Sequence, residues 1–359
     1  MTGRDAFAHA SNASSDAASG TAAEATRRTR CPPRGEVSHR TRPRAACYRA
    51  PRSDAARMRP STLAWIGIAQ AIGGATPAFT KLALDGLGPF GLVVARQILG
   101  SLFLLSLAWA APGLRGAQAA APRAPWTPRD VALLLTMSWA GFALPQLLGA
   151  IGLERSSATH GALLSPLEPI GILLGAALVL REPLGAPHVV AGGLGVLGTI
   201  AIVLSGGGDA RSGDLTGDLV MAAGHLCWAI YTVAAKPLLL RHDPLRISIA
   251  AGFVSWIPLV PLAAFEPFDL ARALPALGWV LLLALLSSGL GTVSWNRALR
   301  DVSAGTMALF VFVQPVVGLL VGMLLGERAG IWAILGAAAI VVGVAIATLR
   351  AERIWPVSS

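Results

Sequence analysis

Long apolar stretches alternate with short polar connections along most of the chain. A helix needs about 20 apolar residues to cross the hydrocarbon core of a bilayer. At that length, ten segments qualify, at residues 62–84, 88–111, 130–152, 157–180, 185–205, 216–239, 246–265, 275–297, 303–325 and 329–349. Several connections are so short that consecutive segments are expected to be antiparallel neighbours. The pattern predicts an all-α polytopic membrane protein with about ten transmembrane helices.

The fourth and ninth segments share a motif. Glu168-Pro169 lies in one and Gln314-Pro315 in the other, with the two prolines 146 residues apart. Each pair is followed by two glycines four residues apart, Gly171 with Gly175 and Gly318 with Gly322, and then by an acid, Glu182 or Glu327. Short or interrupted apolar segments at matching places in two halves of a chain indicate the binding site of a duplicated transporter.

The first helices of the two halves also correspond. Lys81 matches Lys236, and Pro89 matches Pro244, both at an offset of 155 residues. Because five segments per half is an odd number, the second half must enter the membrane from the opposite side. The sequence therefore predicts two inverted five-helix repeats, at residues 61–205 and 216–349.

The composition is typical of a membrane protein, and most of the net positive charge lies in the N-terminal residues. The chain is 54% apolar and 13% charged, with a mean hydropathy of +0.62. Of the net charge of +10, residues 1–59 contribute +7. We expect residues 1–60 to form a basic disordered tail; alternatively, translation starts at Met58 and the tail is a mis-assigned start. A tail without aromatic interleaving does not indicate nucleic-acid binding.

The basic residues in the short connections predict the orientation. With the N-terminus inside, eleven of them fall on the cytoplasmic side and five on the outside. We therefore expect a multi-pass protein of the plasma (inner) membrane with both termini cytoplasmic, including a C-terminal tail at residues 350–359.

Glu168 is the strongest candidate for a functional residue. It lies about eleven residues into its segment, which places it about 16 Å deep, near the middle of the membrane. A carboxylate there is costly unless it faces water or a partner or is protonated. We interpret it as a substrate-binding or proton-coupling acid, with Gln314 as its polar counterpart; the alternative is a structural ion pair or hydrogen bond between helices. Helix breaks are expected at Pro166, Pro169 and Pro315.

Other polar and aromatic side chains fall inside apolar segments. Arg96 could pair with Glu168, bind an anionic substrate group, or form a structural salt bridge. Further candidates for the lining of a cavity are His225, Trp228, Tyr231, Trp139, Gln146 and Trp295. Each of these taken alone is also typical of helix packing. Gly192, Gly195 and Gly198 suggest a tight interface, and a homodimer is compatible with it.

The sequence contains no phosphate loop and no HExxH, GxSxG or CxxC motif. We therefore expect no enzymatic activity, no cofactor and no metal, apart from proton coupling. Two alternatives to a transporter remain: a membrane lipid-handling protein, which should carry acids or histidines clustered at one face, and a non-transporting membrane scaffold.

Together these residues resemble the EamA-type branch of the drug/metabolite transporter superfamily, over about residues 62–349. The resemblance rests on the stretch Gly74–Lys81 with Pro89 and Arg96, and on the two Glu/Gln-Pro motifs with their following acids. It implies ten helices around a central cavity and secondary transport, often export of amino acids or other small metabolites. Gly73 departs from the family pattern, which often has Trp there. We expect a carrier that moves a small metabolite by alternating access.

Overall fold

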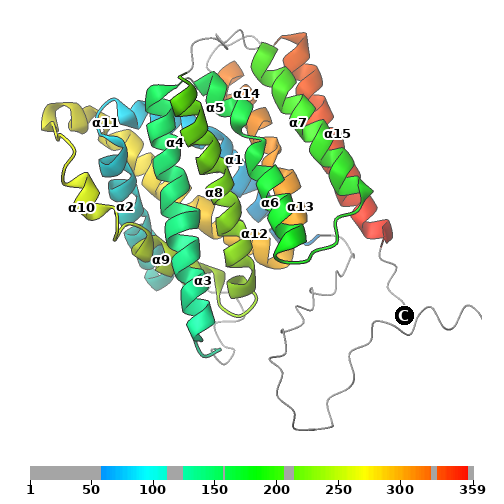
Figure 1. Cartoon of the computed structure of the whole chain (residues 1–359), viewed down its shortest axis with the longest axis horizontal. Coiled ribbons are helices and arrows are strands. Elements are labelled where there is room, and N and C mark those ends of the chain that lie inside the picture. The colour runs from blue at the N-terminus through cyan, green and yellow to red at the C-terminus, as the bar shows by residue number, and fades with distance from the viewer. Residues whose placement is uncertain (1–57, 111–123, 157, 206–213, 325–329, 355–359) are drawn as a thin grey trace, which may run out of the picture. The chain divides into compact units, whose positions relative to one another are not determined.

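The computed structural model describes residues 58–110, 124–156, 158–205, 214–324 and 330–354, which contain helices and no strands (Figure 1). The helices are α1 Pro60–Leu84, α2 Pro89–Ala110, α3 Pro128–Ser138, α4 Leu144–Arg155, α5 Ala158–Leu164, α6 Leu167–Leu178, α7 Ala186–Ser205, α8 Leu215–Leu239, α9 Pro244–Ser255, α10 Val260–Ala263, α11 Leu270–Leu282, α12 Thr292–Asp301, α13 Ala304–Val311, α14 Val313–Leu324 and α15 Ile331–Ile354. The tails predicted at residues 1–60 and 350–359 fall mostly outside the described residues.

The all-α polytopic architecture is confirmed. Six helical segments in the described part of the chain are long and apolar enough to cross a membrane. They are Pro89–Ala110, Pro128–Arg155, His160–Leu178, Ala186–Ser205, Leu215–Leu239 and Leu270–Asp301. The 25-residue α1 and three shorter apolar segments, Pro244–Ser255, Ala304–Leu320 and Ile331–Ile346, complete the ten predicted positions.

The seventh segment is shorter than predicted. The sequence suggested one helix over residues 246–265, but α9 ends at Ser255 and only the short α10 follows. Pro258 and Pro261 lie in this region. Proline cannot donate to the carbonyl four residues earlier and clashes with it, which explains the break.

The third and eighth segments both contain a π-helical stretch. Trp139–Ala143 separates α3 from α4, and Leu283–Gly291 separates α11 from α12. The position 146 residues after Trp139–Ala143 lies within the second stretch, so both carry the same distortion at the same place. These π-helical turns therefore support the inverted repeat, although the sequence alone does not predict the turns.

The fourth and ninth segments are broken helices, as the prolines predict. The first breaks at Ser165–Pro166 between α5 and α6, and the second at Phe312 between α13 and α14. Glu168 and Gln314 are each the second residue of the half-helix that follows. The half-helices that follow the two breaks therefore begin at equivalent positions.

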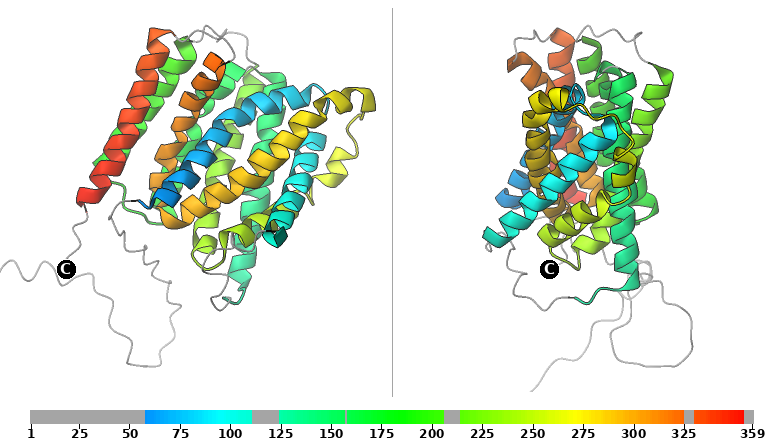
Figure 2. Two further views of the ribbon diagram at one scale, coloured as in Figure 1. Left: turned by 180° about the vertical axis from the view of Figure 1, so that it is seen from behind. Right: turned by 90° about the vertical axis from the view of Figure 1, so that its left-hand side faces the viewer.

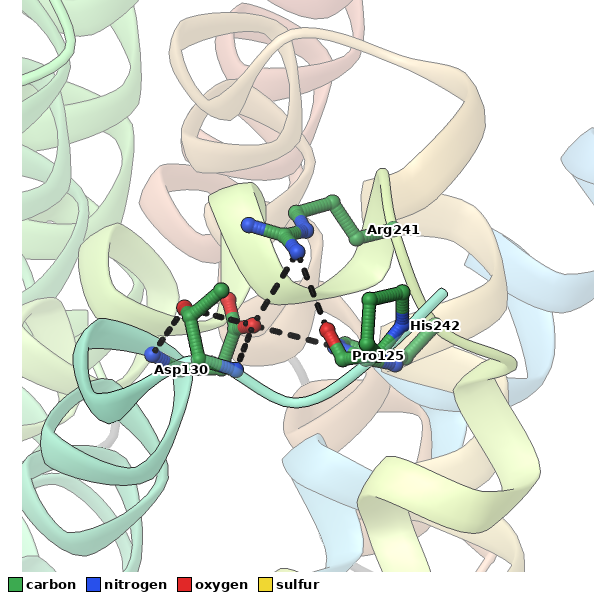
Figure 3. A network of polar contacts seen from close by, with 5 residues as sticks. Pro125, Asp130, Arg241 and His242 are labelled. Carbon is green, nitrogen blue, oxygen red and sulfur yellow. Dashed lines mark hydrogen bonds and ion pairs between the residues drawn. The ribbon is translucent and has the colours of Figure 1, made fainter. Parts of the chain in front are cut away.

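We call the end of the bundle at which α1 begins the proximal end, and the opposite end distal. At the proximal end, Asp130 near the start of α3 binds the turn between α8 and α9 (Figure 3). Its Oδ2 lies 3.3 Å from a guanidinium nitrogen of Arg241 and 3.6 Å from His242 Nε2. Arg241 also donates to the carbonyl of Pro125, at 3.2 Å. This network ties the third segment to the sixth and seventh.

Helices α7 and α15 pack side by side along their length (Figures 1 and 2). A Cβ on Gly198 would lie 2.5 Å from the carbonyl oxygen of Gly336, and one on Gly336 would lie equally close to that of Gly198. A Cβ on Gly195 would lie 2.4 Å from the ring of Phe312. Gly195 and Gly198 therefore allow close packing within one chain, and the homodimer stays a prediction.

Candidate functional site

A small cavity separates the two equivalent helix breaks. Its lining comes from the break in the fourth segment and the break in the ninth: Ser165, Glu168, Pro169, Val311, Phe312, Gln314 and Pro315. The cavity has a volume of about 10 Å³, room for about one water molecule. The structure thus brings Glu168 and Gln314 to one place, as the repeat predicts, together with Pro169 and Pro315; Pro166 precedes α6.

The side chain of Glu168 lies close to a histidine of α8. Its Oε2 lies 3.5 Å from Nδ1 of His225, and the two side chains are 13% and 25% exposed. At the amino end of a helix, a carboxylate is also stabilised by the helix dipole. In the described structure, Glu168 has no arginine or lysine within ion-pair distance. Its carboxylate oxygens are hydrogen-bond acceptors that can also bind a cationic group.

Gln314 is held by a residue that the sequence analysis missed. Its Nε2 donates to Oε1 of Gln70 in α1, at 3.0 Å. Nε2 of Gln70 is buried and has no hydrogen-bond partner among the described residues. The sequence does contain a signal for this residue, because Gln70 is a polar residue within an apolar segment. In the structure its side chain is 1% exposed.

Two glycines allow this contact. A Cβ on Gly73 would lie 2.6 Å from Nε2 of Gln314, and one on Gly74 would lie 2.7 Å from the carbonyl oxygen of Gln314. Gly73, at a position where the family often has Trp, therefore leaves the space that the Gln314 side chain occupies.

An aromatic cluster continues from His225 along α8. Trp228 stacks on Tyr231, with ring centroids 4.7 Å apart, and meets Trp295 of α12 edge-on at 5.6 Å. Tyr231 is fully buried and donates to Oδ1 of Asn296 at 3.1 Å. Tyr231 and Trp295 are thus core residues, whereas Trp228 is partly exposed. Nε1 of Trp295 is buried without a hydrogen-bond partner in the described part of the chain.

Arg96 does not pair with Glu168. It is 3% exposed and binds two hydroxyls of the π-helical stretch: Nε donates to Ser288 Oγ at 3.1 Å, and a terminal nitrogen donates to Ser287 Oγ at 2.7 Å. No carboxylate lies within ion-pair distance of it among the described residues. Arg96 therefore holds the eighth segment at its wide turn.

The structure does not bring Trp139 to the cavity. Its side chain is 42% exposed, and its indole donates to the carbonyl of Val254, at 2.9 Å. Gln146 is half-buried, and its Oε1 has no hydrogen-bond partner in the described ranges. Neither residue lines the cavity between the two helix breaks.

The arrangement has the chemistry of a binding site. It offers a carboxylate with an imidazole at 3.5 Å on one side and amide N–H groups on the other. The partly exposed indole of Trp228 lies one helical turn from the imidazole along α8. Within the described ranges, no group of three or more His, Cys, Asp or Glu side chains is placed to hold a metal ion.

Comparisons with known proteins agree with this architecture. The model of the EamA-like transporter family matches residues 60–204 and again residues 215–349. A probable terminal-alkyne amino-acid exporter of Streptantibioticus cattleyicolor is 28% identical over 272 residues, which cover 75% of this chain and 87% of that protein. An aromatic amino acid exporter, YddG, of Ancylobacter novellus is 25% identical over 209 residues, covering 56% of this chain and 70% of the other.

A solved crystal structure shares the fold. It matches with a TM-score of 0.65 at 22% identity and covers 83% of this chain and all of the other. The family model covers more than half of the chain, in two stretches that each contain one Glu/Gln-Pro motif. The chain is therefore a multi-pass membrane protein that belongs to the EamA-like transporter family.

Proposed function

We propose that this protein exports a small zwitterionic metabolite of the amino-acid class by alternating access, using the cavity between Glu168 and Gln314. The observation that carries the proposal is the opposition of chemical groups across that cavity. A carboxylate lies at one helix break, and an amide pair with an unpartnered N–H group lies at the other.

These groups complement an α-amino acid. The ammonium of the substrate would bind Glu168, because opposite charges attract strongly where water is scarce. Its carboxylate would accept hydrogen bonds from Nε2 of Gln70 and Nε2 of Gln314. The partly exposed Trp228, one helical turn beyond His225, would contact the substrate side chain. The cavity as described holds about one water molecule, so a substrate enters only when the two half-helices move apart.

Glu168 and His225 also offer a route for proton coupling. A proton that enters the site would compete with the ammonium for the carboxylate of Glu168, and His225 at 3.5 Å could receive or deliver it. Exchange of one proton for one substrate would then follow from competition for a single acid. The basic residues of the connections support placement in the plasma membrane with both termini cytoplasmic.

The names of two relatives support the substrate class, since one is named as an aromatic amino acid exporter and the other as a probable terminal-alkyne amino-acid exporter. The test is metabolite profiling of medium and cells that produce the full chain, the Glu168→Ala variant, or Glu154→Gln as a matched control. Glu154 is an exposed acid at the end of α4. An amino-acid-like compound should accumulate in the medium with the unmodified chain and the control but not with Glu168→Ala. Equal export by all three would refute the role of Glu168.

A further inference from the structure

A buried carboxylate joins the two repeats at the proximal end. Glu182, which follows α6, is 7% exposed. Its Oε1 accepts the N–H of Ala304 at 3.1 Å, and its Oε2 accepts the N–H of Gly305 at 3.0 Å. These are the first two residues of α13, where a negative charge is favoured by the helix dipole and by unsatisfied N–H groups.

A buried lysine joins the repeats at the same end. Lys236 of α8 is fully buried, and its Nζ donates to the carbonyls of Leu299 at 2.6 Å and Val302 at 2.5 Å. These carbonyls lie at the carboxyl end of α12, where a cation is favoured for the converse reason. Glu182 also attracts the charge of Lys236. The proximal end is therefore closed by two charged groups that bind helix termini.

The inverted repeat assigns equivalents to these groups at the distal end. Lys81 corresponds to Lys236, and the end of α4 corresponds to the end of α12. Residues 153–158 read LERSSA and residues 299–304 read LRDVSA, so Leu153 matches Leu299 and Ser156 matches Val302.

The distal contact is not made. Lys81 is exposed, and it has no hydrogen bond or ion pair among the described residues. The half-helices behave in the same way: α6 packs against α13 at the proximal end, whereas their distal equivalents α5 and α14 show no comparable packing. The two ends of the bundle therefore differ: the proximal end makes these contacts and the distal end does not.

Each end also has a contact between helices that correspond in the two repeats. At the distal end, Asp218 at the start of α8 accepts a hydrogen bond from Ser156 and lies 2.6 Å from His160 Nδ1. At the proximal end, Thr62 of α1 donates to Asp301 of α12, at 2.9 Å. These contacts hold α8 to α4 and α5, and α1 to α12. They define two groups of helices that can rock against each other.

We propose that Lys81 is the distal counterpart of Lys236, and that the two lysines are buried in turn. When the distal end closes, Nζ of Lys81 takes up the carbonyls of Leu153 and Ser156 at the end of α4, and Lys236 leaves those of α12. The last carbonyls of a helix have no partner within it, so they are available acceptors. This proposal rests on the proposed function, since it names the residues that alternate the access to its cavity.

The exchange also explains how the two states can have similar free energies. Burying a lysine at membrane depth is costly, and hydrogen bonds to helix carbonyls offset the cost. If one lysine is buried in each state, the number of desolvated ammonium groups stays constant. A carrier needs states that differ by only a few kcal/mol.

The test measures from which side the cavity is open. A single cysteine is introduced by Ser165→Cys into the full chain with its natural cysteines replaced. The rate of reaction with a membrane-impermeant maleimide is measured in intact cells and in inverted membrane vesicles. The ratio of the two rates reports the balance between the two open states and needs no substrate. A cysteine introduced by Phe268→Cys, at an exposed distal position, first establishes which side the distal end faces.

Lys81→Met should raise the ratio of distal to proximal labelling by about tenfold, and Lys236→Met should lower it by a similar factor, because each loses hydrogen bonds from a charged donor. Lys81→Arg keeps the charge and the donors, so its ratio should lie close to that of the unmodified chain. Arg272→Met removes an exposed distal charge without touching α4, so its ratio should not change. Ratios that do not move, or that move in the same direction in both methionine variants, would overturn the proposal.

A second measurement covers the case in which Lys81→Met fails to fold. Cysteines introduced by Lys81→Cys and Glu154→Cys should be joined by a short bifunctional maleimide in cycling protein, and absence of that cross-link would also overturn the proposal. Opposite shifts of the labelling ratio without any export of an amino acid would leave the alternating lysines standing and refute the proposed function. Export of an amino acid with unchanged labelling ratios would support the proposed function and refute the alternating lysines.

Discussion

Removing the charge of Glu182 should destabilise the protein far more than the same change at Glu266. Both carboxylates accept two backbone N–H groups at the start of a helix. Glu182 binds Ala304 and Gly305 of α13, and Glu266 binds Phe90 and Gly91 of α2, at 3.0 and 2.7 Å. Glu182 is 7% exposed, whereas Glu266 is only half-buried, so water can replace its hydrogen bonds.

The magnitude follows from the contacts. A hydrogen bond to a charged group contributes about 1.5–3 kcal/mol. Glu182→Gln keeps one acceptor oxygen but turns an NH2 group toward one buried N–H group. We therefore expect a loss of about 2–3 kcal/mol at position 182, and about 1 kcal/mol or less at position 266, where water screens the charge. At about 2 °C or less per kcal/mol for a chain of this size, Glu182→Gln should lower the Tm by about 3–6 °C.

The assay is thermal unfolding of the purified protein in detergent, followed by the fluorescence of its ten tryptophans. Glu182→Gln and Glu266→Gln are compared at the same pH and scan rate. If the two variants unfold at the same temperature, or if Glu266→Gln is the less stable one, the reasoning from burial is wrong.

Three further predictions concern packing. Gly73→Ala should displace the flexible Gln314 side chain and raise the KM for the exported compound several-fold with little change in Tm, measured in transport and unfolding assays; an unchanged KM would contradict the contact. Gly198→Leu should separate α7 from α15 at Gly336 and lower the Tm strongly, because the atom it meets is backbone; a Tm within 1–2 °C of the unmodified chain would contradict this packing. Tyr231→Phe should cost about 1 kcal/mol by leaving Asn296 without one donor, seen as a small drop in Tm, and a rise in Tm would contradict it.

Much of the fold could be predicted from the sequence because its signals are local. Apolar length predicted the positions of the apolar helical segments, and Glu168-Pro169 and Gln314-Pro315 predicted the positions of the two broken helices. The break after Ser255 was missed, although Pro258 and Pro261 were visible, because the segment as a whole remained apolar.

The candidate site was harder to predict, because it depends on which side of a helix each residue faces. Trp139 and Trp295 look alike in the sequence, yet one is 42% exposed and the other 3%. Lys81 and Lys236 were recognised as equivalent, but the sequence gives no reason why only Lys236 is buried. In the exchange proposed above, that difference depends on which end of the bundle is closed.

Glu168 is proposed to bind the ammonium of an amino-acid substrate. The most direct test is counterflow of L-phenylalanine into liposomes that contain the purified full chain, with N-acetyl-L-phenylalanine as the analogue that lacks the ammonium. The partly exposed Trp228, one helical turn from His225, and the name of the aromatic amino acid exporter among the relatives make phenylalanine a suitable probe. We predict saturable counterflow of phenylalanine, little of the acetylated analogue, and a KM at least about tenfold higher in Glu168→Gln, as expected for loss of a charged contact of about 1.4 kcal/mol or more. Absence of phenylalanine counterflow, or equal counterflow of both compounds with an unchanged KM in Glu168→Gln, would contradict the account.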